Sequence, residues 1–183
     1  MVLETCRLVL RAPEPAEAAA YAAVWSNPDV VRYLGGKLWT LEDARDAISR
    51  MRRHWEWFGF GLFSVVRKED ERTLGRVGLL AWDPSRWTNG LWERVDEPWE
   101  TEIGWTLGRE FWGRGFATEA AIACRDWAFG SLGVGRLISL IAPMNAASIR
   151  VAEKLGERLE REDIGGPFPK RVDLYALGNP PAR

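Results

Sequence analysis

The stretch from Trp99 to Ser131 constrains the fold of this chain more than any other part of the sequence. Apolar side chains alternate at Ile103, Trp105 and Leu107, which predicts a strand with one buried face. A short turn rich in arginine and glycine follows, and from Phe116 onward small and apolar residues occupy most positions of a predicted helix. The stretch therefore predicts a strand, a glycine-containing turn and a largely buried helix in direct succession.

The start of this predicted helix suits an anionic group. The first turn of a helix leaves backbone N–H groups without partners at the positive end of the helix dipole. Gly113 and Gly115 allow a ligand to approach the backbone closely. The stretch lacks the P-loop pattern GxxxxGK followed by Ser or Thr, and Thr118 occupies the third glycine position of a dinucleotide fingerprint. Two interpretations therefore remain: the helix start binds a phosphate group, or the glycines serve only the turn.

The segment EIGWTLGREFWGRGFATEA resembles strand four, the pyrophosphate loop and helix three of the GNAT acyltransferase superfamily. Gly113, Arg114 and Gly115 match the loop pattern, whereas Glu110 stands where Gln or Arg is usual. That departure is similar to the branch that acetylates ribosomal-protein N-termini. The segments PMNAASIRVAEKLG and CRLVLRAPEPAEAAAYAAVWSNPDVVRYLGG also resemble this branch. The resemblance thus covers most of the chain.

The pattern of elements predicts one α/β domain spanning residues 1–183. By resemblance, its sheet is mixed and mostly antiparallel, is flanked by helices and contains a splayed parallel strand pair. A Gly-Gly-Pro turn precedes the last strand. The predicted strands are Leu3–Arg11, Gly59–Arg67, Thr73–Ala81, Ile103–Leu107, Arg136–Ala142, Arg158–Ile164 and Val172–Leu177.

Helix ends are indicated by capping residues. Pro13 and Pro15 open a helix that reaches about Trp25, and Ser26 to Asp29 form a turn signal. Thr40, with Asp43 in a capping box, begins another helix. Its apolar positions are Leu41, Ala44, Ile48, Met51 and Trp55, and its other face carries Arg45, Arg50, Arg52 and Arg53. Those arginines indicate a solvated surface, or alternatively a site for an acidic partner or phosphate. Asn145 and Gly156 are the predicted ends of a later helix.

The overall charge excludes some functions. The 25 Lys and Arg residues balance 26 Asp and Glu residues, so no global field favours nucleic acid or an anionic membrane. Cys6 and Cys124 fit neither a disulfide framework nor a metal cluster, and Cys124 is expected to be a buried thiol. No signal segment or membrane span is apparent. We expect a cytoplasmic monomer or homodimer without a metal ion.

The resemblance implies acetyl-coenzyme A as co-substrate. Its pyrophosphate would bind backbone donors of the loop Arg109–Ala117, with added charge from Arg109 and Arg114. The strand end near Trp105–Leu107 would splay from Arg136–Ala142, and the freed backbone would pair with the pantetheine arm and stabilise an oxyanion. The expected contacts are Trp105, Thr106, Leu107, Arg109, Gly113, Arg114, Gly115, Phe116, Ala117, Thr118 and Asn145.

Candidate catalytic residues lie at both ends of this region. In the related branch the serine that matches Ser148 protonates the departing thiolate, and the asparagine that matches Asn145 contacts coenzyme A. The alternative is that Asn145 only caps the helix whose first turn contains Ser148. Many relatives use a tyrosine as this acid, and Tyr175 is the nearest in sequence.

Several residues are candidates for the general base. Glu102 begins the strand and shares a face with Gly104 and Thr106. Asp163 and Asp173 are rivals. His54, the only histidine, is expected to be half-buried or exposed on the arginine-rich helix.

A polar segment with several tryptophans, residues 83–99, precedes the central strand. Loops of this length are often functional, so the segment is a candidate for an aromatic, acidic mouth that binds a cationic amine. A surface loop or a dimer contact is the alternative. The residues concerned are Trp87, Trp92, Trp99, Glu93, Glu97 and Glu100.

These observations favour an N-acetyltransferase that moves an acetyl group directly from acetyl-coenzyme A to a primary amine. The acceptor is either a protein N-terminus or a small-molecule amine. A non-catalytic acyl-coenzyme A sensor would keep Gly113 and Gly115 but lack transfer, and a dinucleotide-binding domain would prefer NAD.

Overall fold

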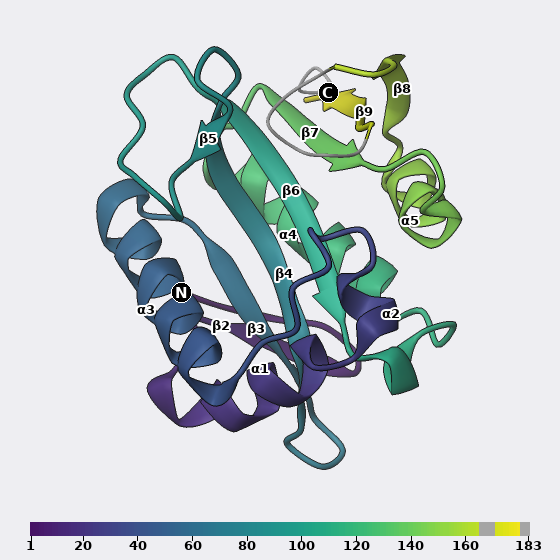
Figure 1. Ribbon diagram of the computed structural model, residues 1–183. Helices are drawn as coiled ribbons and strands as arrows, with labels where there is room; N and C mark the ends of the chain where they lie inside the picture. The colour runs from purple at the N-terminus through teal and green to yellow at the C-terminus, as the bar shows by residue number, and fades with distance from the viewer. Residues whose placement is uncertain (165–170, 180–183) are drawn as a thin grey trace.

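The computed structural model describes residues 1–164 and 171–179 (Figure 1). Its centre is one twisted sheet with strand order β1-β2-β3-β4-β6-β7-β9-β8, and the short β5 pairs with β4. Among the described strands only β6 and β7 pair in parallel, so the predicted mixed α/β fold is confirmed. The strands are β1 (Val2–Glu4), β2 (Leu8–Arg11), β3 (Leu62–Arg67), β4 (Thr73–Asp83), β5 (Thr88–Asn89), β6 (Glu100–Leu107), β7 (Arg136–Ile141), β8 (Arg158–Arg161) and β9 (Asp173–Gly178).

Helices cover both faces of this sheet. On one face α4 packs over Ile103 and Leu107, and on the other α1 and α3 pack over Leu62 and Leu80 (Figure 1). The apolar side chains of β6 therefore lie on the face under α4, as the alternation in the sequence predicted. The helical segments are η1 (Pro15–Glu17), α1 (Ala18–Trp25), α2 (Pro28–Val31), α3 (Leu41–Phe58), η2 (Arg109–Phe111), α4 (Phe116–Gly130) and α5 (Ala146–Leu155).

The prediction of one strand across Leu3–Arg11 is wrong, because a tight turn divides it into β1 and β2. The Thr5 side chain closes this turn by accepting the Leu8 N–H at 3.0 Å, while the Thr5 N–H bonds the Leu8 carbonyl at 2.9 Å. Leu8 and Leu10 are fully buried, as their spacing indicated. Asn27 likewise caps the short helix α2 where only a turn was expected.

The capping prediction for α3 is confirmed, since Thr40 and Asp43 form a reciprocal capping box. On its outer face Arg50 lies over the Trp92 ring and Arg53 over the Trp57 ring. These arginines thus have aromatic neighbours on the surface, and Arg52 donates to the Pro13 carbonyl.

The prediction for His54 is wrong, because this side chain is fully buried. Its Nε2 accepts the Ala81 N–H at 3.1 Å, so Nδ1 carries the proton that bonds the Phe60 carbonyl at 2.9 Å. Burial lowers the pKa of His54 to about 4. A neutral histidine here joins α3 to β4 and has a structural role. Its position three residues after Met51 put it on the apolar face of the helix.

Among residues 1–164 and 171–179, no helix has the length and apolar character that a membrane crossing requires. Within the same residues, no cluster of three or more His, Cys, Asp or Glu side chains is arranged to hold a metal ion. The predicted Gly-Gly-Pro turn lies outside the described residues.

Candidate active site

The parallel strands β6 and β7 separate soon after they meet. They pair only at Thr101 with Leu137 and at Glu102 with Ile138, although β6 continues to Leu107. Each strand keeps its other neighbour, since β4 follows β6 along its whole length and β9 follows β7. The two strands diverge visibly in Figure 1, and the part of β6 after Glu102 has an edge that is not paired with β7.

A buried hydroxyl stands where the ladder stops. Ser139 is 2 % exposed, and its Oγ donates to the Ile103 carbonyl at 2.9 Å, replacing the next backbone bond of the ladder. The same Oγ lies 3.0 Å from Oε1 of Glu157, a side chain only 3 % exposed. A serine has a single proton to donate. Both short contacts are satisfied together when Glu157 is protonated and donates to Ser139.

The environment of Glu157 favours this neutral form. Burial raises the pKa of Glu157 to about 8, and the nearby Glu102 charge adds to the rise. Its other oxygen, Oε2, is buried without a hydrogen-bond partner among the described residues. Glu157 therefore keeps a proton near neutral pH and fixes the hydroxyl that ends the β6–β7 ladder.

Replacing Glu157 by Gln should make the protein less sensitive to alkaline pH. The folded-state pKa lies above the unfolded value, so unfolded chains lose this proton first, and the wild-type protein loses stability as pH rises from about 4.5 to 8. Glutamine donates a similar hydrogen bond without titrating. Thermal unfolding at pH 5 and pH 8.5 measures the difference. Equal pH dependence in both proteins would contradict a neutral Glu157.

The loop after β6 has the geometry that an anion site needs. Gly113 and Gly115 adopt left-handed φ values of 71° and 80°, and no side chain caps the start of α4 at Gly115. The first N–H groups of α4 are therefore not used by a capping side chain. Arg109 and Arg114 flank the loop and are exposed. Arg7, which sequence reasoning missed, donates to the Arg114 carbonyl at 3.0 Å and pairs with Glu119 at 2.6 Å.

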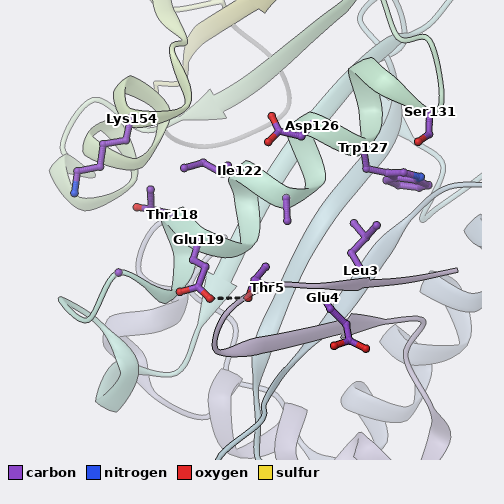
Figure 2. Close-up of a pocket in the computed structure, with 12 residues that line it drawn as sticks. Leu3, Glu4, Thr5, Thr118, Glu119, Ile122, Asp126, Trp127, Ser131 and Lys154 are labelled. Atoms are coloured by element: carbon purple, nitrogen blue, oxygen red, sulfur yellow. Dashed lines mark hydrogen bonds between the residues drawn. The ribbon is translucent and has the colours of Figure 1, made fainter.

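A groove of about 860 Å³ runs from this loop along the outer side of α4 (Figure 2). Thr118, Glu119 and Asp126 of α4 line it, with the β1 segment on one side and Lys154 of α5 on the other. The acids are paired, Glu119 with Arg7 and Asp126 with Arg125. Lys154 has no ion pair in the described part of the chain, so a cation remains available beside the start of α4.

Asn145 and Ser148 have the predicted arrangement. The Asn145 side chain accepts the Ser148 N–H at 3.2 Å and caps α5, so the structural role expected of this asparagine is present. The Ser148 hydroxyl is not used in the cap and is partly buried. Across the gap, Trp105 packs against a buried cluster that contains Ile141, Ala152 of α5 and Tyr175 of β9. Ser148 and Tyr175 thus both belong to the α5 side of the separated strands.

Glu102 is the last residue of β6 that pairs with β7, and it lies on the sheet face opposite α4. It is paired in register with Leu80, a residue of the core under α1 and α3. Burial raises the pKa of Glu102 to about 7, and the nearby Arg76 guanidinium opposes the rise. A carboxyl group that titrates near neutrality next to a strand gap is suited to proton transfer.

One of the two rival carboxylates is engaged in the structure. Asp173 is 5 % exposed, and its carboxylate accepts the Asp163 N–H at 2.9 Å and the Arg171 side chain at 3.3 Å. Asp163, which contributes only its backbone N–H to this contact, has a φ of 46° after β8. The Asp173 carboxylate therefore has a structural role at the start of β9.

The tryptophan-rich segment does not form one aromatic mouth. Trp87 packs on Trp82, Trp99 packs on Phe58, and Trp92 is 67 % exposed beside Arg50. Of the predicted acids, Glu93 pairs with Arg86, and Glu97 and Glu100 line a groove of about 500 Å³ with Trp99 at the start of β6. The interpretation of this segment as a single amine-binding mouth is wrong, because its aromatic residues pack into separate parts of the molecule.

The sequence matches the acetyltransferase (GNAT) domain over residues 7–158, most of the chain. The chain belongs to the GNAT acetyltransferase family. An N-acetyltransferase of Bacillus licheniformis, p20, is 31% identical over 178 residues, which cover 94% of this chain and 92% of that protein. An acetyltransferase of Agrobacterium tumefaciens is 28% identical with a TM-score of 0.77, covering 97% and 94% of the two chains.

A ribosomal-protein-S5-alanine acetyltransferase from Vibrio fischeri has the same GNAT fold, with a TM-score of 0.76 and 18% identity over 100% of this chain and 99% of that one. GNAT enzymes take their acetyl group from acetyl-coenzyme A, so this chain is an acyltransferase. The uncapped start of α4, its glycine loop and the free edge of β6 fit the pyrophosphate and pantetheine of this co-substrate.

Substituting Gly113 by Ala should weaken the binding of acetyl-coenzyme A at least tenfold. Titration calorimetry measures this affinity. A left-handed φ costs a non-glycine residue roughly 1–2 kcal/mol, so the loop N–H groups reorient and some stability is lost as well. Gly133→Ala is the matched control, because Gly133 has a φ of 66° and equally open surroundings but lies after α4. Equal affinities in the two variants would remove the loop from the binding site.

Proposed function

We propose that this GNAT enzyme is an N-acetyltransferase that transfers the acetyl group directly from acetyl-coenzyme A to a primary amine. One observation carries the proposal: a carboxyl group titrating near neutral pH, Glu102, stands where β6 and β7 part. The uncapped helix start that suits a pyrophosphate lies at the other end of the same strand. The free thiols Cys6 and Cys124 agree with a cytoplasmic enzyme.

Four groups of this chain have roles in the proposed reaction. Backbone donors of residues 113–118 bind the pyrophosphate, with Arg109, Arg114 and Lys154 adding positive charge. A backbone N–H on the free edge of β6 stabilises the oxyanion that forms at the thioester carbonyl. Glu102 accepts the proton of the amine, directly or through water, and Ser148 donates a proton to the departing thiolate.

The bonds and protons balance in this scheme. The amine nitrogen bonds the acetyl carbon, and the carbon–sulfur bond breaks. Glu102 holds the proton from nitrogen and returns it to solvent. Ser148 delivers its proton to sulfur and is reprotonated from solvent. Coenzyme A therefore leaves as the thiol, and the enzyme regains its starting state. Tyr175 is the alternative acid.

Release of free thiol from acetyl-coenzyme A in the presence of a panel of amines tests the proposal. We expect thiol release that depends on the amine and yields one acetylated product per thiol, detected by mass spectrometry. Binding of acetyl-coenzyme A without transfer to any amine would instead identify a sensor module. Tighter binding of NAD than of coenzyme A would overturn both readings in favour of a dinucleotide-binding domain.

A further inference from the structure

The sheet face opposite α4 carries a cation and an acid separated by a position without side chains. In antiparallel strands, directly paired residues project to the same face. Three successive pairs of this kind lie along β4 and β6. Taken in order they are Arg76 with Thr106, Gly78 with Gly104, and Leu80 with Glu102. Arg76 and Glu102 therefore stand at diagonal corners of the set, and neither strand supplies a side chain between them.

The middle position is open at Gly104, whereas a side chain at Gly78 would meet the Gly61 carbonyl oxygen. A side chain built at Gly104 would meet only Oε1 of Glu102, at 4.0 Å, and Gly104 itself is partly exposed. Glu102 thus borders the hollow above Gly104. Among the described residues it makes no hydrogen bond and no ion pair, so its carboxyl group is available to a ligand.

Arg76 lacks the partner that its charge requires. Within residues 1–164 and 171–179 no carboxylate lies within ion-pair distance of its guanidinium group. Its neighbours are the Met51 sulfur, 3.9 Å from Nη1, and the rings of Trp25 and Trp39, whose centres lie 4.9 Å and 5.9 Å from Cζ. Guanidinium groups bind carboxylates through paired, charge-assisted hydrogen bonds. A partly buried arginine among indole rings and a thioether is therefore suited to receive an anion.

A segment of the chain crosses in front of this face. It is the stretch between α2 and α3, which passes in front of β4 and β6 (Figure 1) and brings Trp39 to Arg76. The Tyr33 hydroxyl of this stretch donates to the Met144 carbonyl at 3.0 Å, and Asp29 of the adjoining helix α2 lies 3.8 Å from Arg109 of the loop. A face that is crossed by a segment fixed in this way favours a small molecule over an extended polypeptide.

We propose that the acceptor is a small primary amine that also carries a carboxylate, with its amino group at Glu102 and its carboxylate bound by Arg76. This inference rests on the proposed acetyl transfer. The amine nitrogen forms the amide bond as the thioester carbon–sulfur bond breaks, Glu102 takes the proton from nitrogen, and coenzyme A leaves as its thiol. Arg76 orients the acceptor and takes no part in bond breaking, so it is a specificity-determining residue.

Rates of thiol release with matched acceptors test the inference. The acceptors are glycine, β-alanine, γ-aminobutyrate and δ-aminovalerate. The rate with each one is compared with the rate for its own carboxamide. A peptide with an acidic second residue is a further comparison. For the best carboxylate we expect a kcat/KM roughly ten- to a hundredfold above that of its amide. Arg76→Gln should remove that preference, so that within this variant each carboxylate and its own amide react at similar rates. Arg53→Gln, an arginine over a tryptophan on the outer side of α3, should keep it.

Each of the other possible outcomes contradicts a specific part of the inference or of the proposed function. Transfer to carboxylates and amides at equal rates would refute the inference and leave the proposed acetyl transfer intact, whereas no transfer to any amine would refute both. A preference that survives in Arg76→Gln would remove Arg76 from the site, and faster transfer to peptides would exclude a small acceptor. Arg76→Lys is a second test of the same residue if Arg76→Gln does not fold. It keeps the charge without the planar fork, so its preference should be intermediate.

Discussion

Glu102→Gln should lower kcat/KM for a lysine-like amine by up to about a thousandfold at neutral pH, because the variant must wait for amine that is already deprotonated. Wild-type activity should rise with pH and level off above the pKa of Glu102, about 7. The activity of the variant should continue to rise until the amine itself loses its proton, near pH ~10.4 for a lysine-like acceptor.

The pH dependence of the loss separates a base from a structural residue. Below about pH 7 both enzymes lose activity in parallel, so the ratio of their rates is constant. Above about pH 7 the ratio of the wild-type rate to the variant rate should shrink by roughly tenfold per pH unit. This decline should extend over about three pH units for a lysine-like amine and about one pH unit for an α-amino group of pKa ~8. The groups that act on this titration are Arg76, which lowers the pKa, and Glu157, whose own pKa responds to the charge of Glu102.

Glu100→Gln is the matched control for this measurement. Glu100 lies two residues earlier on β6, before the paired positions Thr101 and Glu102, and its carboxylate pairs with Arg136 at 3.4 Å. Its substitution should leave the pH–rate profile unchanged. Superimposable profiles for Glu102→Gln and the wild-type enzyme would remove Glu102 as the base and leave Asp163, Asp173 or solvent in that role.

Local sequence signals predicted much of the fold and of the local geometry at the candidate co-substrate site. The period of Ile103, Trp105 and Leu107 identified β6, and the glycines at 113 and 115 adopt the left-handed geometry that makes them useful before a helix. Thr40 and Asn145 form the caps that their positions indicated. Such features depend on neighbours within a few residues, which is why one sequence suffices to find them.

Residues that depend on distant partners were harder to find. Glu157 follows a helix and has an ordinary surface composition around it, yet Ser139, a residue of another strand, gives it a buried partner. Arg76 is the one charge inside the run from Leu74 to Trp82, and this was the available signal that something unusual faces it. The tryptophans of residues 83–99 illustrate the converse, because sequence proximity did not bring their side chains together.

Ser148→Ala should reduce kcat by about a hundredfold or more while the KM for acetyl-coenzyme A changes little, if this hydroxyl protonates the thiolate. The substitution leaves the helix cap intact, since the Asn145 side chain bonds the Ser148 backbone N–H and not its hydroxyl. Alanine is also favoured within helices. Loss of activity in this variant therefore reports the hydroxyl itself, provided that acetyl transfer limits the rate.

The leaving group supplies the decisive comparison for Ser148. A thiol of pKa ~8.5 needs help to leave at neutral pH but departs as thiolate above that value, so the defect of Ser148→Ala should shrink as the pH passes it. Acetyl thioesters of more acidic thiols should reduce the defect in the same way. Tyr175→Phe is the parallel variant. The pKa of Tyr175 is raised, chiefly by burial, and its phenol stays protonated throughout this range. A full-speed Ser148→Ala enzyme together with a slow Tyr175→Phe enzyme would assign the proton to the tyrosine and leave Ser148 as a residue of the first turn of α5.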